Sequence, residues 1–292
     1  MRDVLRLEES AGLTGAANPD FVIERARPGD GLQIARLMAD MQAPDILPLT
    51  IWSSPHADIY VEDVIQQINA TNDEFRVLRL AGQILGVVYL RLVENMILID
   101  SIYAAPEIRH DQLAPLLCHC SVVAYSRCHP SGSVALDALE SARSIRALHR
   151  SLGARPHSRR LWWVLPLPKP SDSQPAEILG LAEADQTHAR RGFSSFQVVT
   201  RSGSYDIGRL PGPYFRLTCA AGAEDPELLN ALTCRDPVRQ LLVIAEEHWT
   251  SSSFSPVAAT IRSVASYDVF LQALQRLIPS RWQSQMPVFA AT

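Results

Sequence analysis

Apolar residues in the first half of the chain follow the periods of strands and helices in turn. The segment FVIERARPGD, residues 21–30, predicts a strand that ends in a turn. In GLQIARLMADM, which follows, apolar residues recur at helical spacing, with Asp30 as a candidate N-cap. VEDVIQQINA predicts a second short helix. EFRVLRL and ILGVVYLRLV then predict a hairpin that turns at Ala81–Gln83.

The pattern continues along the same alternation of strands and helices. It predicts a strand over Met96–Ala104, a helix over 113–127, a strand over 133–139, a helix over 142–152 and a final strand in RRLWWVLPL. In that final strand, alternation places Trp162 and Trp163 on opposite faces. The order predicts an α/β fold built around one mixed sheet.

The second half of the chain predicts further strands and helices of its own. We divide the chain into an N-terminal arm (1–20), a first domain (21–167), a proline-rich linker (168–175) and a smaller α/β domain (176–292). The segment YFRLTCAAGAEDPELLNAL loosely repeats the order of FVIERARPGDGLQIARLM. A degenerate tandem repeat is one interpretation of this likeness, and chance is the other.

Composition narrows the class of protein. Of 292 residues, 47% are hydrophobic and 20% charged, which is typical of a globular chain. The formal net charge of -4 gives no basic face for nucleic acid, and no apolar run reaches the length of a membrane span. The first residues carry charges where a secretory peptide needs an apolar block, so we expect a cytoplasmic protein. The five cysteines include no CxxC pair, which predicts free thiols and no metal site.

Two stretches carry candidate chemistry. The strand that ends at Ala104 runs through a short segment into the helix that begins at Leu113, and a helix N-terminus placed in this way can bind an anionic phosphate. The residues between are Ala105-Pro106-Glu107-Ile108-Arg109-His110-Asp111-Gln112. The next strand holds Leu136-Asp137-Ala138 and leads into the helix segment IRALHRSLGA, residues 145–154.

These stretches, and the order of elements around them, resemble the GCN5-related N-acyltransferase (GNAT) family. The family pattern V-x-P-x-x-R, followed by G-x-G/A, matches here in its proline, in Arg109 and in Ala114. A second family pattern, A-x-x-L-Y-x-x-L-G-F, matches residues 145–154 without a gap. The sequence departs from the family at Gln112 for glycine, at His149 for tyrosine and at Ala154 for phenylalanine. The resemblance covers residues 21–167.

The resemblance implies a mixed, mostly antiparallel sheet flanked by helices, with acetyl-CoA as co-substrate. Backbone N–H groups at the start of the helix would hold the pyrophosphate, and the pantetheine arm would lie along the end of the preceding strand. The implied cofactor-binding residues are Ile102, Tyr103, Ala104, Arg109, His110, Asp111, Gln112, Leu113 and Ala114.

Three side chains are candidates for proton transfer. His149 stands where the family commonly has an acidic tyrosine, and imidazole titrates near neutral pH. Asp100 lies inside an apolar strand, where an unpaired charge is costly, so it is either hydrogen-bonded structure or a tuned base. Glu140 stands at a strand end. Each also has a plain structural interpretation as a packing or surface residue.

The resemblance implies an enzyme that moves an acyl group from acyl-CoA to a primary amine on a small molecule or peptide. An alternative is a catalytically degenerate module that keeps the fold for binding or regulation. A third hypothesis is that the C-terminal part forms a homodimer, with Trp249, Phe254 and Trp282 as interface anchors. The irregular segment 43–60, with Trp52 and His56, is a candidate lid over the acceptor.

Overall fold

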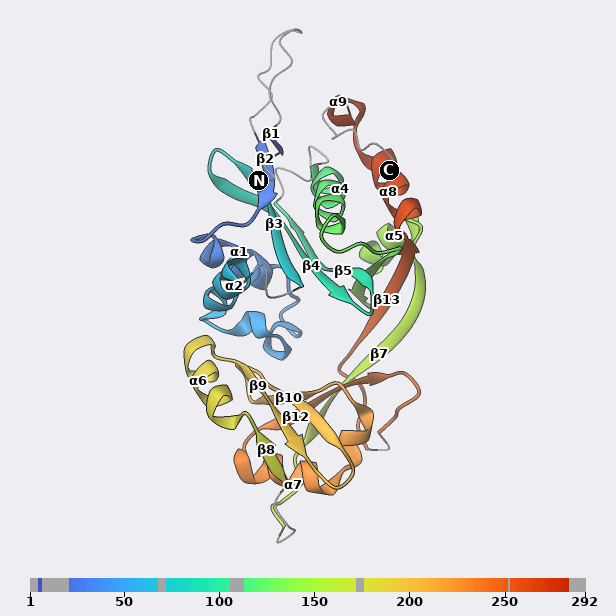
Figure 1. Ribbon diagram of the computed structural model, residues 1–292. Helices are drawn as coiled ribbons and strands as arrows, with labels where there is room; N and C mark the ends of the chain where they lie inside the picture. Colours follow the sequence, from blue (N-terminus) through green and yellow to red (C-terminus); the bar gives the residue numbers. More distant parts are fainter. Residues whose placement is uncertain are drawn as a thin grey trace.

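The computed structural model describes residues 5–6, 21–67, 72–105, 113–171, 176–251 and 253–283. These residues build one 13-stranded sheet in the order β1-β2-β3-β4-β5-β6-β13-β7-β12-β11-β10-β9-β8 (Figure 1). The pairs β5–β6 and β11–β12 are parallel, and the sheet is otherwise mostly antiparallel. The predicted fold class, a mixed sheet with helices on its faces, is confirmed.

The first half follows the predicted order of elements. Its elements are β1 (Leu5–Arg6), β2 (Phe21–Arg25), α1 (Gly31–Asp40), η1 (Leu47–Leu49), η2 (Ile51–Ser53), α2 (Ala57–Gln66), β3 (Asp73–Leu80), β4 (Gln83–Val93), β5 (Met96–Ala104), α4 (Leu113–Ser126), β6 (Ser133–Leu139), α5 (Arg143–Ser151) and β7 (Arg155–Pro166). The helix predicted from VEDVIQQINA starts four residues earlier, at Ala57. The predicted hairpin turn is present, with positive φ angles at Ala81 and Gly82.

The second half repeats part of this order. Its elements are β8 (Glu177–Leu179), α6 (Leu181–Arg191), β9 (Ser194–Val199), β10 (Ser204–Arg209), β11 (Tyr214–Leu217), η3 (Ala220–Glu224), α7 (Pro226–Arg235), β12 (Gln240–Glu246), β13 (Ala258–Ser266), α8 (Tyr267–Leu277) and α9 (Ser280–Gln283). The strand–helix–strand unit β11-α7-β12 has parallel strands, as β5-α4-β6 does. The segment YFRLTCAAGAEDPELLNAL, singled out in the sequence as a possible repeat, contributes β11 and α7 to this unit.

The two halves share strands at the middle of the sheet. Strand β13 comes from the end of the chain, yet it pairs with both β6 and β7 of the first half. Strand β7 pairs on its other edge with β12 of the second half. The segment 168–175 therefore separates the two halves in sequence but does not divide the sheet.

The core of the first half also includes helices from the end of the chain. Phe270 and Leu274 of α8 are buried in the same apolar cluster as Leu117 of α4 and Ile99 of β5. Trp282 packs edge-on against Phe21 of β2, with ring centroids 5.2 Å apart. Trp282 is therefore a core residue, contrary to its expected role as an interface anchor.

The opposite face of the first half carries α1, α2 and the segment that precedes α2. Trp52 is buried against Tyr60 and Phe75. Leu49 packs in one cluster with Leu210 and Leu242 of the second half. The segment 43–60, expected as a lid, is thus packed against both halves, with Trp52 in the core.

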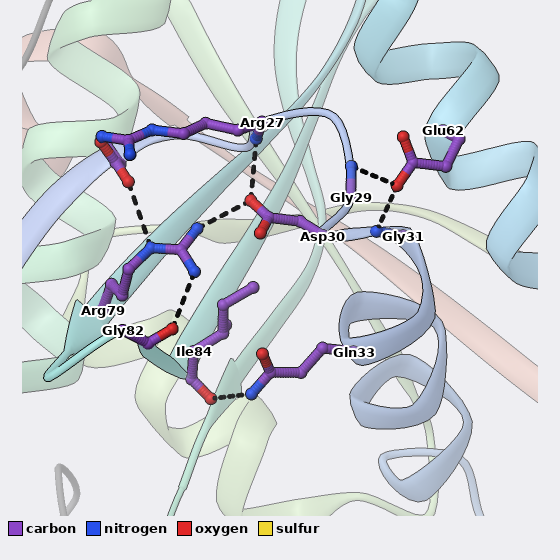
Figure 2. Close-up of polar contacts among 10 residues, drawn as sticks. Arg27, Gly29, Asp30, Gly31, Gln33, Glu62, Arg79, Gly82 and Ile84 are labelled. Atoms are coloured by element: carbon purple, nitrogen blue, oxygen red, sulfur yellow. Dashed lines mark hydrogen bonds and ion pairs between the residues drawn. The ribbon is translucent and has the colours of Figure 1, made fainter.

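The turn from β2 into α1 is held by two acidic side chains (Figure 2). Asp30 stands at the predicted N-cap position, but its carboxylate accepts hydrogen bonds from the Arg27 amide and from Arg79, each at 2.8 Å. Glu62 of α2 instead accepts from the amides of Gly29 and Gly31, at 2.9 and 2.7 Å. The first amide of α1 and an amide of the preceding turn therefore find their acceptor on the neighbouring helix.

Because α8 shares a core with α4, a lesion in α8 should loosen a helix that lies about 150 residues earlier in sequence. We expect Phe270→Ala to lower the free energy of unfolding by about 3–5 kcal/mol, through a cavity at a fully buried ring. Hydrogen exchange should then accelerate in α4, between Leu113 and Ser126. The neighbouring Val269→Ala, at a side chain that is 47% exposed, is the control and should cost under about 1 kcal/mol. Unchanged exchange in α4 would contradict the shared core.

The capping role of Glu62 gives a second prediction. Glu62→Ala should lower the free energy of unfolding by about 1–3 kcal/mol, because two backbone amides lose a charged acceptor. Glu62→Gln keeps one oxygen acceptor and should cost less. Glu183→Ala, on the exposed face of α6, serves as the control in chemical denaturation. Equal midpoints for the Glu62→Ala and Glu183→Ala variants would show that the cap contributes nothing.

Candidate active site

Strands β5 and β6 part in the middle of the sheet. Their parallel ladder covers only Ile97–Ile99 against Val134–Leu136, although β5 continues to Ala104. Beyond Ile99, β5 is paired with β4 alone among the strands. The two strands therefore open into a splay whose base lies at Asp100 on β5 and Asp137 on β6.

A β-bulge lies at the base of this splay. Tyr89 pairs with Ser101 and Leu90 with Ile99, so Asp100 is an extra residue on β5. A bulge leaves the extra residue outside the regular ladder and bends the strand. Asp100 therefore stands on an interrupted backbone at the point where β5 leaves β6.

The Asp100 carboxylate is only loosely paired. Its Oδ1 lies 4.0 Å from Nη1 of Arg91, and the Ser101 hydroxyl donates to its Oδ2 at 3.3 Å. The side chain is 32% exposed, so it faces an opening and not the sealed core. Burial of the carboxyl raises the pKa of Asp100; Arg91 opposes this shift, and Asp137 adds to it. A carboxylate with a raised pKa is suited to accept a proton near neutral pH.

Two tyrosines and an ion pair lie beside Asp100. The hydroxyls of Tyr60 and Tyr89 are 2.8 Å apart, and Tyr89 donates to Asp73 at 2.9 Å. Arg91 donates to the other oxygen of Asp73 at 3.2 Å. Burial raises the pKa of both tyrosines, so their hydroxyls stay protonated and act as hydrogen-bond donors.

Asp137 is held more firmly. Arg262 of β13 donates to both of its oxygens, at 2.8 and 2.7 Å, in a bidentate ion pair. Arg262 and Asp137 are direct cross-strand partners. The strand shared between the halves thus fixes one of the two carboxylates at the base of the splay.

Arg216 of β11 brings a charge from the second half. Its side chain is exposed and lies over Gly208 of β10, where a Cβ would come within 3.3 Å of its Nε. It has no ion pair with any residue that the structure describes. The surrounding protein and the Arg91 guanidinium lower the pKa of Arg216, while Tyr60 and Asp100 raise it.

Three of these residues, Asp137, Arg262 and Arg216, lie on one face of the sheet. The cross-strand pairs run from Asp137–Arg262 to Ala258–Trp162, then from Trp162–Ile244 to Leu242–Arg216 and Arg216–Gly208. Each step along a strand in this series spans an even number of residues, so the side chains share a face. We use the name seam cluster for Tyr60, Asp73, Tyr89, Arg91, Asp100, Asp137, Arg216 and Arg262.

The residues implied to bind the cofactor are described in part. Ile102, Tyr103 and Ala104 form the end of β5 beyond the splay, and Leu113 and Ala114 begin α4. The side chain of Leu113 is buried, which leaves the backbone as the polar part of this helix start. Arg109, His110, Asp111 and Gln112 lie outside the described residues.

The two other candidates for proton transfer differ from Asp100. His149 is buried on α5, and burial lowers the pKa of its imidazole, with Asp137 opposing. Its Nδ1 has no hydrogen-bond partner in the described part of the chain. Glu140 accepts two hydrogen bonds from Arg159, at 3.1 and 2.7 Å, and this pairing lowers the pKa of Glu140. Burial thus favours the neutral form of His149, and the ion pair with Arg159 favours the carboxylate form of Glu140.

The equivalent helix start in the second half is closed by its own side chain. Asp225 caps α7, where its Oδ1 accepts from the amides of Glu227 and Leu228 at 2.9 and 3.3 Å. The first turn of α4, by contrast, holds no acidic residue. The amides at the start of α7 are therefore occupied by a carboxylate, whereas the first turn of α4 has no acidic side chain that would repel an anion.

Other chemistry is sparse. Over the described ranges, no group of three His, Cys, Asp or Glu side chains is placed to hold a metal ion. Cys118 and Cys120 are buried in α4, where burial raises the pKa of each thiol to about 12. No helix within the described part of the chain has the length and apolarity to cross a membrane.

Most of the seam cluster was missed from sequence. Asp100 was noticed because a charge interrupts an apolar strand. Asp73 and Arg91 stand at strand ends, where charges are ordinary, and Arg216 lies in the short segment YFRL. The alternation of side chains along each strand shows which residues of that strand share a face. The order of the strands in the sheet is also needed to place residues of different strands together, and the sequence did not give that order.

Comparison with known proteins gives a likeness of fold only. No protein-family model and no curated protein sequence matches the chain. A tandem GNAT protein of the clavulanic acid biosynthesis pathway, solved without acetyl-CoA, superposes with a TM-score of 0.59 at 14% identity, over 85% of this chain and 98% of that one. A GCN5-related N-acetyltransferase from Sphaerobacter thermophilus gives 0.53 at 15% identity, over 84% and 95%.

The match to a tandem protein spans both halves, and each half contains a strand–helix–strand unit with parallel strands. The resemblance noticed from sequence is thereby confirmed at the level of architecture. The chain has the GNAT fold, in a tandem arrangement in which the two halves share the central strands of one sheet.

Proposed function

We propose that the first half transfers an acetyl or other acyl group from acyl-CoA to a primary amine. The observation that carries this proposal is the bulge at Asp100, at the base of the splay between β5 and β6. A bulged backbone can aim an N–H at a carbonyl oxygen, and a splay leaves room beside it for an extended chain.

The thioester would lie along β5. Pantetheine is an extended, amide-bearing chain, and it would pair with the strand over Ile102–Ala104 as an added strand does. The pyrophosphate would lie at the start of α4, near Leu113 and Ala114, where the helix dipole favours an anion and the first turn itself holds no acidic residue. The contribution of Arg109–Gln112 remains a prediction from sequence.

A comparison with α7 of the second half supports the proposal that the start of α4 binds the pyrophosphate. At α7 the Asp225 carboxylate already accepts the amides that a phosphate would need. Pro115 removes one donor from α4, but first-turn N–H groups without a helical partner remain available. We therefore propose one acyl-CoA site in the chain, on the first half.

Asp100 is the proposed base. An acceptor amine arrives largely as an ammonium ion and must lose a proton before it can attack. The amine nitrogen then forms a bond to the thioester carbonyl carbon, and the carbon–sulfur bond breaks. Asp100 accepts the first proton from the ammonium ion and later passes it to solvent. The nitrogen loses a second proton as the amide forms, and this proton goes to the departing thiolate, so the products are an amide and the thiol of coenzyme A. Tyr60 and Tyr89, as protonated hydroxyls, would hydrogen-bond the acceptor beside Asp100.

His149 and Glu140 do not enter this scheme as proton donors. A lowered pKa leaves His149 neutral at pH 7, so it lacks the extra proton that an acid would give to a leaving thiolate. Glu140 is occupied by Arg159. We propose that His149 supports the splay through its packing near Asp137.

Two measurements test the proposal. Titration of acetyl-CoA followed by calorimetry should show binding in the micromolar to millimolar range that is typical of enzyme substrates. Release of free thiol in the presence of a panel of primary amines should then report transfer. Binding without thiol release would favour the alternative of a catalytically degenerate module. Absence of binding at millimolar acetyl-CoA would overturn both.

The role of Asp100 predicts a pH dependence. Because the carboxylate is the active form, kcat/KM for the amine should rise with pH through the raised pKa of Asp100. Asp100→Asn should lower kcat by about 10²–10⁴-fold and abolish that limb of the profile, with KM for acetyl-CoA unchanged. Asp268→Asn, at an exposed position on α8, is the matched control and should behave as the wild type. A pH limb that persists in Asp100→Asn would assign the base elsewhere.

A further inference from the structure

The end of α6 is fastened to α2 and to the segment before α2, so the halves also meet away from the shared strands (Figure 1). The Ser54 hydroxyl donates to the carbonyl oxygen of Arg191 at 2.5 Å. Gly192, with a φ of 76°, ends α6 at this point, and a Cβ on it would clash with the Ser54 hydroxyl oxygen. Asp63 of α2 forms ion pairs with Arg190 at 2.7 Å and with Arg191 at 2.5 Å.

Three side chains contact the ring of Tyr60 at this junction. The Arg191 guanidinium lies over the ring, 5.9 Å from its centroid. Phe193 packs edge-on against it with centroids 5.4 Å apart, and Trp52 does so at 6.2 Å. Edge-on ring pairs and a cation on a ring face each favour particular orientations. Two of the three contacts that orient the Tyr60 ring therefore come from the second half.

The hydroxyl oxygen of Tyr60 is left able to accept a hydrogen bond. Tyr89 donates its only hydroxyl proton to Asp73, at 2.9 Å. The Tyr60 hydroxyl, 2.8 Å from that of Tyr89, must therefore be the donor of the pair. Within the described part of the chain, no group donates to the Tyr60 oxygen in return. Its lone pairs are thus available to a donor such as the N–H of an ammonium ion.

A continuous series of contacts connects this oxygen to the proposed base. From Tyr60 it runs through Tyr89 to Asp73, which accepts from Arg91 at 3.2 Å. Arg91 in turn lies 4.0 Å from Asp100. Tyr89 also stands where the pairing of β4 with β5 shifts at the bulge. The orientation of Tyr60 is therefore coupled to the group that would receive the proton of the amine.

We infer that Arg191 and Phe193 of the second half are positioning residues for the acceptor amine, which they orient through the ring of Tyr60. The inference rests on the proposed function and adds the part that the second half has in it. The acceptor ammonium ion would donate one N–H to the Tyr60 oxygen while Asp100 takes a proton from it. Displacement of a reactant by about 1 Å can lower a rate about 10²-fold, so a holding group needs a fixed orientation.

The test compares Arg191→Gln with Arg190→Gln in the full chain. Both variants lose one ion pair to Asp63, but only Arg191 lies over the Tyr60 ring. With acetyl-CoA and the primary amine that the wild type uses best, Arg191→Gln should raise KM for the amine about tenfold, and KM for acetyl-CoA should stay unchanged. Arg190→Gln is the matched control and should behave as the wild type. Arg191→Lys keeps a cation and should recover part of the loss.

A second pair of variants tests the ring contact. Phe193→Leu removes the ring beside Tyr60 but keeps an apolar side chain, and it should raise the same KM. Phe196→Leu makes the same change at a buried ring of β9 that packs against Phe215. It should lower the melting temperature without a change in KM for the amine. Equal effects of the two variants on this KM would show that Phe193 has a structural role only.

A double-mutant cycle shows whether Arg191 acts through Tyr60. Tyr60→Phe removes the hydroxyl and keeps the ring, and it should itself raise KM for the amine. In that background, Arg191→Gln should have little further effect, because the group that it positions is gone. Additive losses, or equal kinetics for Arg191→Gln and Arg190→Gln, would overturn the positioning role and leave the transferase standing. Absence of thiol release from the wild type with every amine would overturn the transferase and this role together.

Discussion

The backbone pairing of β13 with both β6 and β7 is the constraint on which the rest of the molecule depends. A strand in the middle of a sheet must find partners on both edges, because buried N–H and C=O groups left unpaired are costly. Here β6 of the first half and β7, which continues to the second half, meet only through a strand from the end of the chain. The halves cannot be separated without exposing these edges, so their relative placement is set by hydrogen bonds.

That placement explains how a charged cluster persists within the sheet. Arg262 sits on the shared strand and neutralises Asp137, which would otherwise face Asp100 as a second carboxylate at the base of the splay. Two nearby carboxylates compete for one proton, and removing one charge from the competition limits the shift of the other. Burial still raises the pKa of Asp100, and a carboxylate with a raised pKa is suited to serve as a base. The shared strand thus has both a structural and an electrostatic effect.

The sequence predicted those features that depend on residues close together in the chain. Apolar periodicity located the strands and helices of the first half, and the unusual charge of Asp100 within an apolar strand marked the splay. Strand β10 was missed, because SYDIGR has too few apolar residues to show a clear period. The pairing of β13 with β6 joins residues about 125 apart, and nothing in either segment distinguishes that partner from β7. The burial of Trp282 could not be predicted because its partner, Phe21, lies in the other half of the chain.

The first turns of α4 and α7 differ, and this difference indicates how the two halves of a tandem fold can have different roles. In the second half, the Asp225 carboxylate takes the amides of Glu227 and Leu228, and its other oxygen accepts from the Thr200 hydroxyl at 2.6 Å. A side chain held at three points stabilises α7 but leaves no donors for a phosphate. We therefore propose that the second half contributes to the molecule through the strands that it shares with the first, and that acyl-CoA binds to the first half alone.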